Sequence, residues 1–146
     1  MIKKVIACLL LFSVFVFSPR NVYADPNILC STAVLIDANT GTILFEKNAD
    51  QKMYPASLTK IMTAILALEM GDLSDVIKVD DDTPYEIAGS HVALEPGEIL
   101  SLKDMLYALM LPSANDAALA IAKHYGGGSE EKFVSLMNEK AKELGA

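Results

Sequence analysis

The sequence predicts an α/β fold of the α+β kind, in which an N-terminal β-hairpin is followed by a helical lobe. Two runs rich in strand-favouring residues, 31–37 and 42–47, are separated by a turn cluster that contains Gly41. Apolar stretches of helical length follow, with Pro or Gly at their ends. Strands followed by runs of helices are typical of α+β folds.

Residues 1–24 have the pattern of a signal peptide. Two lysines precede an apolar run, 5–17, and Val22 and Ala24 occupy the positions three and one before Asp25. An uncleaved membrane anchor is the alternative, but about 13 apolar residues fall short of the roughly 20 needed to cross a bilayer. We expect an exported protein, at the periplasmic or extracellular face of the cell wall.

The remaining chain, 25–146, is long enough for one compact domain. Loss of three basic residues with the signal peptide changes the formal net charge from −7 to −10. An acidic domain without a basic stripe is a poor candidate for binding nucleic acid or anionic membranes. Cys30 is the one cysteine left, and His91 and His124 stand far apart, so neither an internal disulfide nor a metal site is predicted.

The first predicted helix spans 57–70, after Pro55 and before Gly71. Lys60 is the only charged residue in 58–68, and apolar side chains occupy every face. We therefore expect this helix to be buried. At about 14 residues it is too short to span a membrane.

An irregular region, 72–101, separates this helix from the next one. It contains two short strand-like pieces, 76–79 and 92–94, among acidic and turn residues. The acidic triplet 80–82 lacks the spacing of a calcium-binding loop, so we interpret it as a solvated loop.

Three more helices are predicted in the last third of the chain. Apolar helical runs occupy 102–111 and 116–125, with a break at 113–115. The last helix has a mostly apolar stripe with helical spacing in 133–144 and ends at Gly145.

Ser57 and Lys60 are candidates for nucleophilic catalysis. Residues three apart share one helical face, so the two side chains can meet. A serine hydroxyl needs a nearby base, and burial favours the neutral amine that a lysine base requires. Helix N-terminal N–H groups can also stabilise negative charge on an acyl oxygen. Alternatively, Ser57 is a helix N-cap and Lys60 extends to the surface.

Ser113 and Asn115 form a second polar interruption between two apolar helices. A hydroxyl and an amide at such a place could relay a proton and hydrogen-bond a peptide substrate. The alternative is an ordinary turn, with Pro112 as the helix breaker and Ser113, Asn115 or Asp116 capping the next helix.

Together, the segments 55–64 and 111–118 resemble the D-alanyl-D-alanine carboxypeptidases of low molecular mass. These penicillin-binding serine peptidases are related to class A β-lactamases, and the wider family's motifs are S-x-x-K, S-D-N and K-T-G. The likeness extends to the hairpin turn 37–41, to 97–98 and to 137–145. It implies a β-lactamase/transpeptidase-like fold.

By this resemblance, Ser57 is the catalytic nucleophile and Lys60 its general base. Ser113 would assist proton transfer, and Asn115 would contact the substrate and the lysine. The implied substrates are peptidoglycan stem peptides ending in D-Ala-D-Ala, and β-lactams would act as inhibitors. No cofactor or metal is implied.

One departure from the family is that no Lys-Thr-Gly follows residue 115. We therefore expect 25–146 to be the N-terminal part of the catalytic domain, with the C-terminal strands of an antiparallel sheet missing. The hairpin would then lack partners and expose an edge prone to association. Membrane anchoring would be possible only through a missing C-terminal segment.

Three other interpretations remain open from the sequence. A truncated, catalytically inactive chain could bind β-lactams or muropeptides. A β-lactamase would share Ser57 and Lys60, although Ser-Ala-Asn stands at 113–115 in place of Ser-Asp-Asn. In a purely structural interpretation, all the polar residues would be helix caps.

Overall fold

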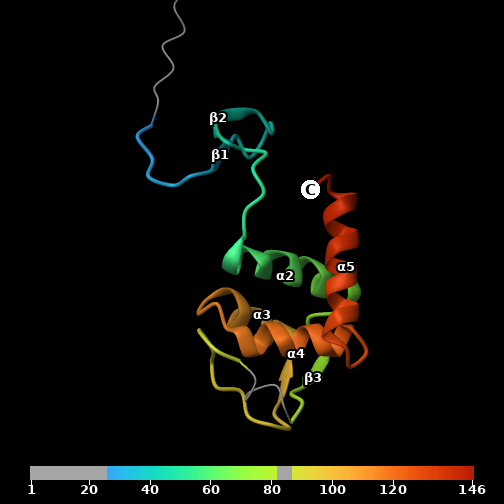
Figure 1. The fold of residues 1–146 in the computed structure, drawn as a ribbon. Helices are drawn as coiled ribbons and strands as arrows, with labels where there is room; N and C mark the ends of the chain where they lie inside the picture. Colours follow the sequence, from blue (N-terminus) through green and yellow to red (C-terminus); the bar gives the residue numbers. More distant parts are fainter. Residues whose placement is uncertain (1–25, 82–86) are drawn as a thin grey trace, which may run out of the picture. The chain divides into compact units, whose positions relative to one another are not determined.

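The computed structural model describes residues 26–81 and 87–146, which form two compact units (Figure 1). The hairpin unit ends at Lys52, and the helical unit begins at Met53. The predicted signal peptide, 1–24, lies outside the described residues. In the described part of the chain, no helix is both long and apolar enough to cross a membrane.

The hairpin unit contains strands β1 (Ala33–Ile36) and β2 (Ile43–Lys47), paired antiparallel. The Asp37 carboxylate fixes the turn by accepting hydrogen bonds from the backbone N–H groups of Asn39 and Thr40, at 3.0 and 2.8 Å. The predicted hairpin is therefore confirmed. More than half of the surface of five apolar strand residues is exposed, namely Val34, Leu35, Ile36, Ile43 and Leu44.

Four helices make up most of the helical unit: α2 (Thr59–Met70), α3 (Leu102–Met110), α4 (Asn115–Tyr125) and α5 (Glu130–Glu143). Helix α4 contacts the other three, so its apolar face supplies much of the core (Figure 1). The largest fully buried apolar side chains are Ile77, Val79, Leu102, Met105, Leu109, Ile121 and Phe133.

A second, short sheet pairs β3 (Val76–Lys78) antiparallel with β4 (Ile99–Ser101). The prediction of a strand-like piece at 92–94 is wrong, because Ala93 has a left-handed backbone with φ of 58° that interrupts extended geometry. The partner of β3 is β4, which leads directly into α3 and was not predicted because it is only three residues long.

The first predicted helix differs from expectation in two ways. Its start is the 3₁₀ turn η1 (Ala56–Leu58), and the α-helix begins only at Thr59. The expected burial is found on one face only, and α2 contacts α3, α4 and α5. Leu58, Ile61 and Leu68 on α2 and its preceding turn are exposed, since no described element of the helical unit covers them.

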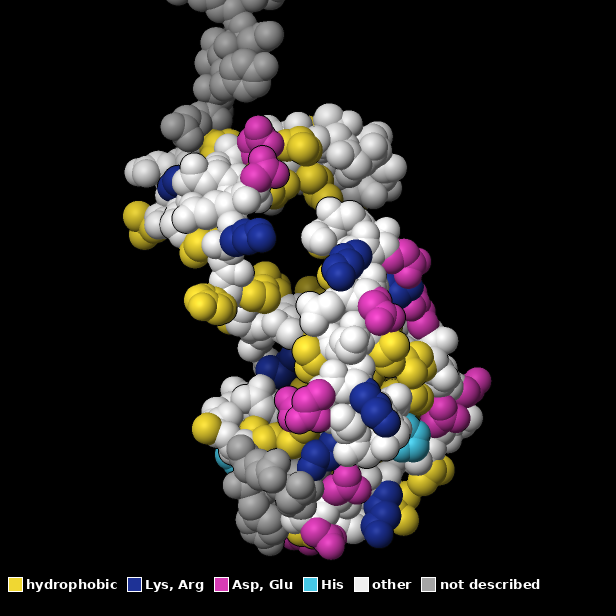
Figure 2. Space-filling model, turned by 45° about the vertical axis from the view of Figure 1, so that its right-hand side comes forward, with side chains coloured by type: hydrophobic (Ala, Val, Ile, Leu, Met, Phe, Trp, Pro, Cys, Tyr) yellow, Lys and Arg dark blue, Asp and Glu magenta, His cyan; other side chains and the backbone are white. Residues whose placement is uncertain are grey.

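An ion pair between Lys140 and Glu69 links helices α5 and α2. Lys140 Nζ lies 2.9 Å from a carboxylate oxygen of Glu69 and 2.8 Å from one of Glu143. On the face shown in Figure 2, basic side chains of the helical unit are interspersed with acidic ones and form no continuous stripe.

Candidate active site

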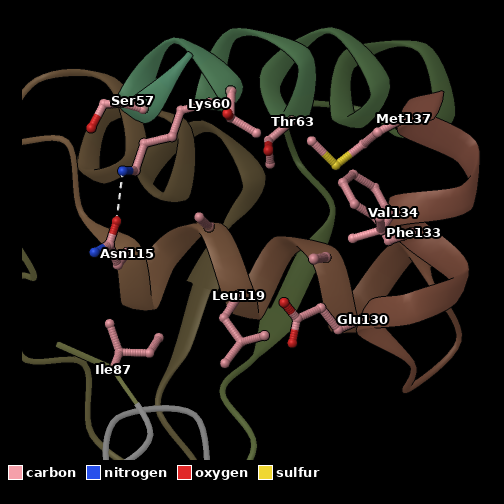
Figure 3. Close-up of a pocket in the computed structure, with 14 residues that line it drawn as sticks. Ser57, Lys60, Thr63, Ile87, Asn115, Leu119, Glu130, Phe133, Val134 and Met137 are labelled. Atoms are coloured by element: carbon pink, nitrogen blue, oxygen red, sulfur yellow. Dashed lines mark hydrogen bonds between the residues drawn. The ribbon is translucent and has the colours of Figure 1, made fainter. Parts of the chain in front are cut away.

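A cavity of about 560 Å³ lies between α2, α4 and α5 in the helical unit (Figure 3). The polar side chains of Ser57, Lys60 and Asn115 lie at one end, and apolar side chains of α5 line the other. The complete lining comprises Ala56, Ser57, Thr59, Lys60, Thr63, Ile87, Asn115, Ala118, Leu119, Ala122, Glu130, Phe133, Val134 and Met137.

Ser57 lies in the 3₁₀ turn before α2 and is exposed. The residue before it, Ala56, has φ of 49°, a left-handed conformation that alanine rarely adopts. Neither η1 nor α2 has a side-chain capping hydrogen bond at its N-terminus. The alternative that Ser57 is an N-cap is therefore wrong, and its hydroxyl is left accessible.

Lys60 begins on α2 and extends across the cavity toward α4 (Figure 3). Only 9% of its surface is exposed, so it does not reach solvent as the snorkelling alternative requires. Its Nζ lies 2.6 Å from Asn115 Oδ1, and this hydrogen bond is drawn as the dashed line in Figure 3. The lysine amine is thereby held in place at the cavity that Ser57 also lines.

Asn115 is fixed by three hydrogen bonds. Besides the bond to Lys60, its Nδ2 donates to the carbonyl of Ala88 at 2.8 Å, and its backbone N–H donates to that of Ser90 at 2.7 Å. Between those two carbonyls lies Gly89, with φ of 92°, where an added Cβ would come within 3.1 Å of Asn115 Nδ2. The amide can therefore present its oxygen to the lysine in one orientation.

Ser113 stands in the turn before α4 with φ of 61°. Its Oγ is buried and has no hydrogen-bond partner among the described residues. The N-cap of α4 is Ala114, and no side chain caps it, so neither Ser113 nor Asn115 is the predicted alternative cap. A buried hydroxyl without a partner is costly, which is typical of groups retained for a function.

The structure thus places three of the four predicted site residues at one cavity: Ser57, Lys60 and Asn115. Ser113 does not line this cavity, although it is two residues from Asn115. The sequence did not predict the backbone carbonyls of Ala88 and Ser90 as partners of Asn115, because every residue has a backbone carbonyl. Asp116 was considered only as a cap, yet its buried carboxylate accepts three backbone N–H groups.

Proteins with similar sequences include two D-alanyl-D-alanine carboxypeptidases. DacF of Bacillus subtilis (strain 168) is 44% identical over 119 residues, which cover 78% of this chain and 30% of DacF. DacC of Escherichia coli (strain K12) is 36% identical over 149 residues, covering 95% of this chain and 37% of DacC. The chain spans about a third of the length of these curated relatives.

Solved structures show the same fold. D-alanyl-D-alanine carboxypeptidase DacD from Francisella tularensis is 30% identical, with a TM-score of 0.77 over 90% of this chain and 33% of that one. Penicillin binding protein 5 from Haemophilus influenzae is 31% identical, with a TM-score of 0.75 over 84% of this chain and 37% of that one. These neighbours confirm the predicted α+β, transpeptidase-like fold class.

The family match covers nearly the whole chain. The family described as D-alanyl-D-alanine carboxypeptidase, Peptidase_S11, matches residues 20–146, which include the hairpin, both motif turns and all four helices. The resemblance found from the two motifs is thereby confirmed. This chain belongs to the D-alanyl-D-alanine carboxypeptidase family of serine peptidases.

Proposed function

We propose that the protein is a serine-type D-Ala-D-Ala carboxypeptidase that removes the terminal D-alanine from peptidoglycan stem peptides through an acyl-enzyme on Ser57. The observation that carries this proposal is the 2.6 Å hydrogen bond between Lys60 Nζ and Asn115 Oδ1, at the cavity that the exposed Ser57 also lines. A buried amine and an accessible hydroxyl at one cavity are the two groups that activation of a serine nucleophile requires.

In the proposed reaction, Ser57 Oγ attacks the carbonyl carbon of the penultimate D-alanine while Lys60 Nζ takes the hydroxyl proton. The tetrahedral intermediate then loses the terminal D-alanine, whose amine receives that proton. Water, deprotonated by the Lys60 amine, then attacks the resulting ester. The bond to Ser57 Oγ breaks, Oγ takes the proton back from Lys60, and the shortened peptide leaves. The backbone N–H groups at the start of α2 are candidates to stabilise the developing oxyanion.

Asn115 and Ser113 have supporting roles in this proposal. Asn115 holds Lys60 in place and offers its amide to the peptide backbone of the substrate. Ser113 assists proton transfer. The support is that its buried Oγ has no hydrogen-bond partner among the described residues and is therefore free to bond another group.

The wider biological assignment follows from the same proposal. β-Lactams would acylate Ser57, and the exported enzyme would act in peptidoglycan biosynthesis and influence cell shape. Residues 1–24 would be the signal peptide, and 25–146 the N-terminal part of the catalytic domain. Periplasmic or extracellular location is proposed on the signal peptide, and its cleavage before Asp25 can be checked by N-terminal sequencing.

Release of D-alanine from a synthetic peptide ending in D-Ala-D-Ala tests the activity. We expect release by the wild-type protein and none by Ser57→Ala. As a control, Ser74→Ala changes a serine in the Asp72 turn, away from the cavity, and should keep the wild-type rate. A chain that binds the peptide without releasing D-alanine would instead support the inactive, binding-only alternative.

A further inference from the structure

The segment 88–94 is held against the start of α4 at every second residue. The carbonyls of Ala88 and Ser90 accept hydrogen bonds from Asn115. The N–H groups of Val92 and Leu94 donate to the carboxylate of the next residue, Asp116. Two consecutive residues of α4 therefore hold one segment, and only the first of them contacts Lys60.

Asp116 is unusual because its carboxylate is almost completely buried. Only 1% of its surface is exposed. Its Oδ2 accepts from Val92 N–H at 3.2 Å and from Leu94 N–H at 3.0 Å, while its Oδ1 accepts from Ala117 N–H at 2.9 Å. No basic side chain in the described ranges forms an ion pair with it. Backbone N–H groups are thus what compensates the buried charge.

The residue between the two donors, Ala93, has φ of 58°. Alanine avoids this left-handed conformation, and it persists only where the surroundings enforce it. A left-handed residue turns its neighbouring N–H groups toward a common point, which makes a concavity that binds an anion. The Asp116 carboxylate is the anion here, so it stabilises the bend at Ala93.

We propose that Asp116 is a positioning residue for the candidate active site. Its carboxylate fixes the bend at Ala93 and, with it, the carbonyls of Ala88 and Ser90. Those carbonyls set the orientation of Asn115, which holds the Lys60 amine. The predicted effect on the reaction rests on the proposed function, whereas the predicted effect on Asn115 does not.

The variant Asp116→Asn tests this chain of contacts, because it keeps the shape and removes one acceptor. The new Nδ2 group cannot accept a hydrogen bond, and its N–H groups would point at the backbone N–H of Val92 or Leu94. We expect acylation by a penicillin to slow by at least about tenfold, the scale of a lost charge-assisted hydrogen bond. The matched control Asp72→Asn alters an exposed carboxylate that accepts from the Ser74 N–H, and it should acylate at the wild-type rate.

A rescue separates positioning from general stability. Glycine at position 93 adopts positive φ without strain, so Ala93→Gly should restore part of the acylation rate in the Asp116→Asn background. A second variant, Gly89→Ala, disturbs Asn115 through the same segment without changing Asp116, and it should also slow acylation. It keeps the test decisive where Asp116→Asn fails to fold.

NMR of the purified full-length protein supplies the readout that is independent of catalysis. In Asp116→Asn we expect faster amide exchange at Leu94 and shifted side-chain amide signals of Asn115. If wild type forms no adduct, the proposed function fails, and these signals alone decide the inference. Unchanged Asn115 signals, or acylation of Asp116→Asn within twofold of wild type, would overturn it.

Discussion

The two turns that carry the candidate site differ in how firmly they are held. Around Asn115, every polar group of the side chain is bonded, to Lys60 and to Ala88, and the backbone N–H is bonded to Ser90. Around Ser57, the turn is exposed, lacks a side-chain cap and is preceded by a left-handed Ala56. Each turn contains a non-glycine residue at positive φ, Ala56 in one and Ser113 in the other. Only the turn at Asn115 has a dense set of hydrogen bonds.

This difference indicates which part of the site is the fixed reference. The amide of Asn115 defines where the Lys60 amine lies, and the exposed Ser57 lines the same cavity. Catalysis by positioned groups depends on their mutual geometry, so losses on the fixed side should propagate to the lysine.

Replacing the base should have the largest effect among these variants. Lys60→Met keeps a long apolar side chain in the buried position but removes the amine. We expect the acylation rate with a penicillin to fall by about 10²–10⁴-fold, the usual contribution of a general base. Lys103→Met, at an exposed position of α3, is the control. A variant at position 60 that reacts at the control rate would exclude Lys60 as the base.

Removing the fixed amide should have a smaller but clear effect. Asn115→Ala leaves Lys60 Nζ and the Ala88 carbonyl without their partner, and we expect acylation to slow by about tenfold to a hundredfold, as for a lost hydrogen bond to a charged group. Asn138→Ala removes an exposed amide that donates to Val134 O at 3.0 Å, and it serves as the matched control. Equal acylation rates for Asn115→Ala and Asn138→Ala would contradict the role of the Asn115 turn in fixing Lys60.

The nucleophile turn can be relaxed with Ala56→Gly. Left-handed alanine costs about 1–2 kcal/mol, whereas glycine raises the entropy of the unfolded chain by about 0.4–1 kcal/mol. The net expectation is a stabilisation of up to about 1 kcal/mol in chemical denaturation, with slower acylation because Ser57 is less constrained. Ala64→Gly, inside α2, should destabilise by about 1 kcal/mol. A destabilised Ala56→Gly would show that the turn is unstrained.

The smallest expected effect is on the pH dependence of stability, through Tyr125 at the C-terminal end of α4. A change there leaves the turns at Ser57 and Asn115 intact. Burial, together with a hydrogen bond to Asp75 at 3.1 Å and the charges of Asp75 and Asp72, raises the pKa of Tyr125 from 10.0 to about 12. Between these pH values the unfolded chain has lost the phenolic proton and the folded chain retains it, so stability falls as the pH rises. Tyr125→Phe should reduce this fall in thermal denaturation; an identical fall would contradict the assignment.

Local patterns sufficed to predict the hairpin, the helices and the motif residues. The Gly41 turn and the Pro and Gly punctuation depend on near neighbours in the chain, so the sequence alone could predict them. By contrast, β4 and the bend at Ala93 depend on partners far away in the sequence. Position 93 is an alanine, which gives no signal of positive φ, and it is the buried carboxylate of Asp116 that enforces the bend.

The same limit applies to the candidate site. Residues three apart on a helix predict that Ser57 and Lys60 are neighbours. The hydrogen bond from Lys60 to Asn115 crosses 55 positions of sequence and could be anticipated only from the family resemblance. Backbone carbonyls such as that of Ser90 carry no sequence signal, although Gly89 beside it marks a close approach.

Intact mass after incubation with a penicillin tests the central claim most directly. The purified protein, shown to be folded by circular dichroism, is compared with Ser57→Ala under the same conditions. We predict that wild type gains the mass of one penicillin molecule and that the variant gains none. A folded wild-type protein without an adduct, or an adduct that persists in Ser57→Ala, would contradict the assignment of Ser57 as an activated nucleophile.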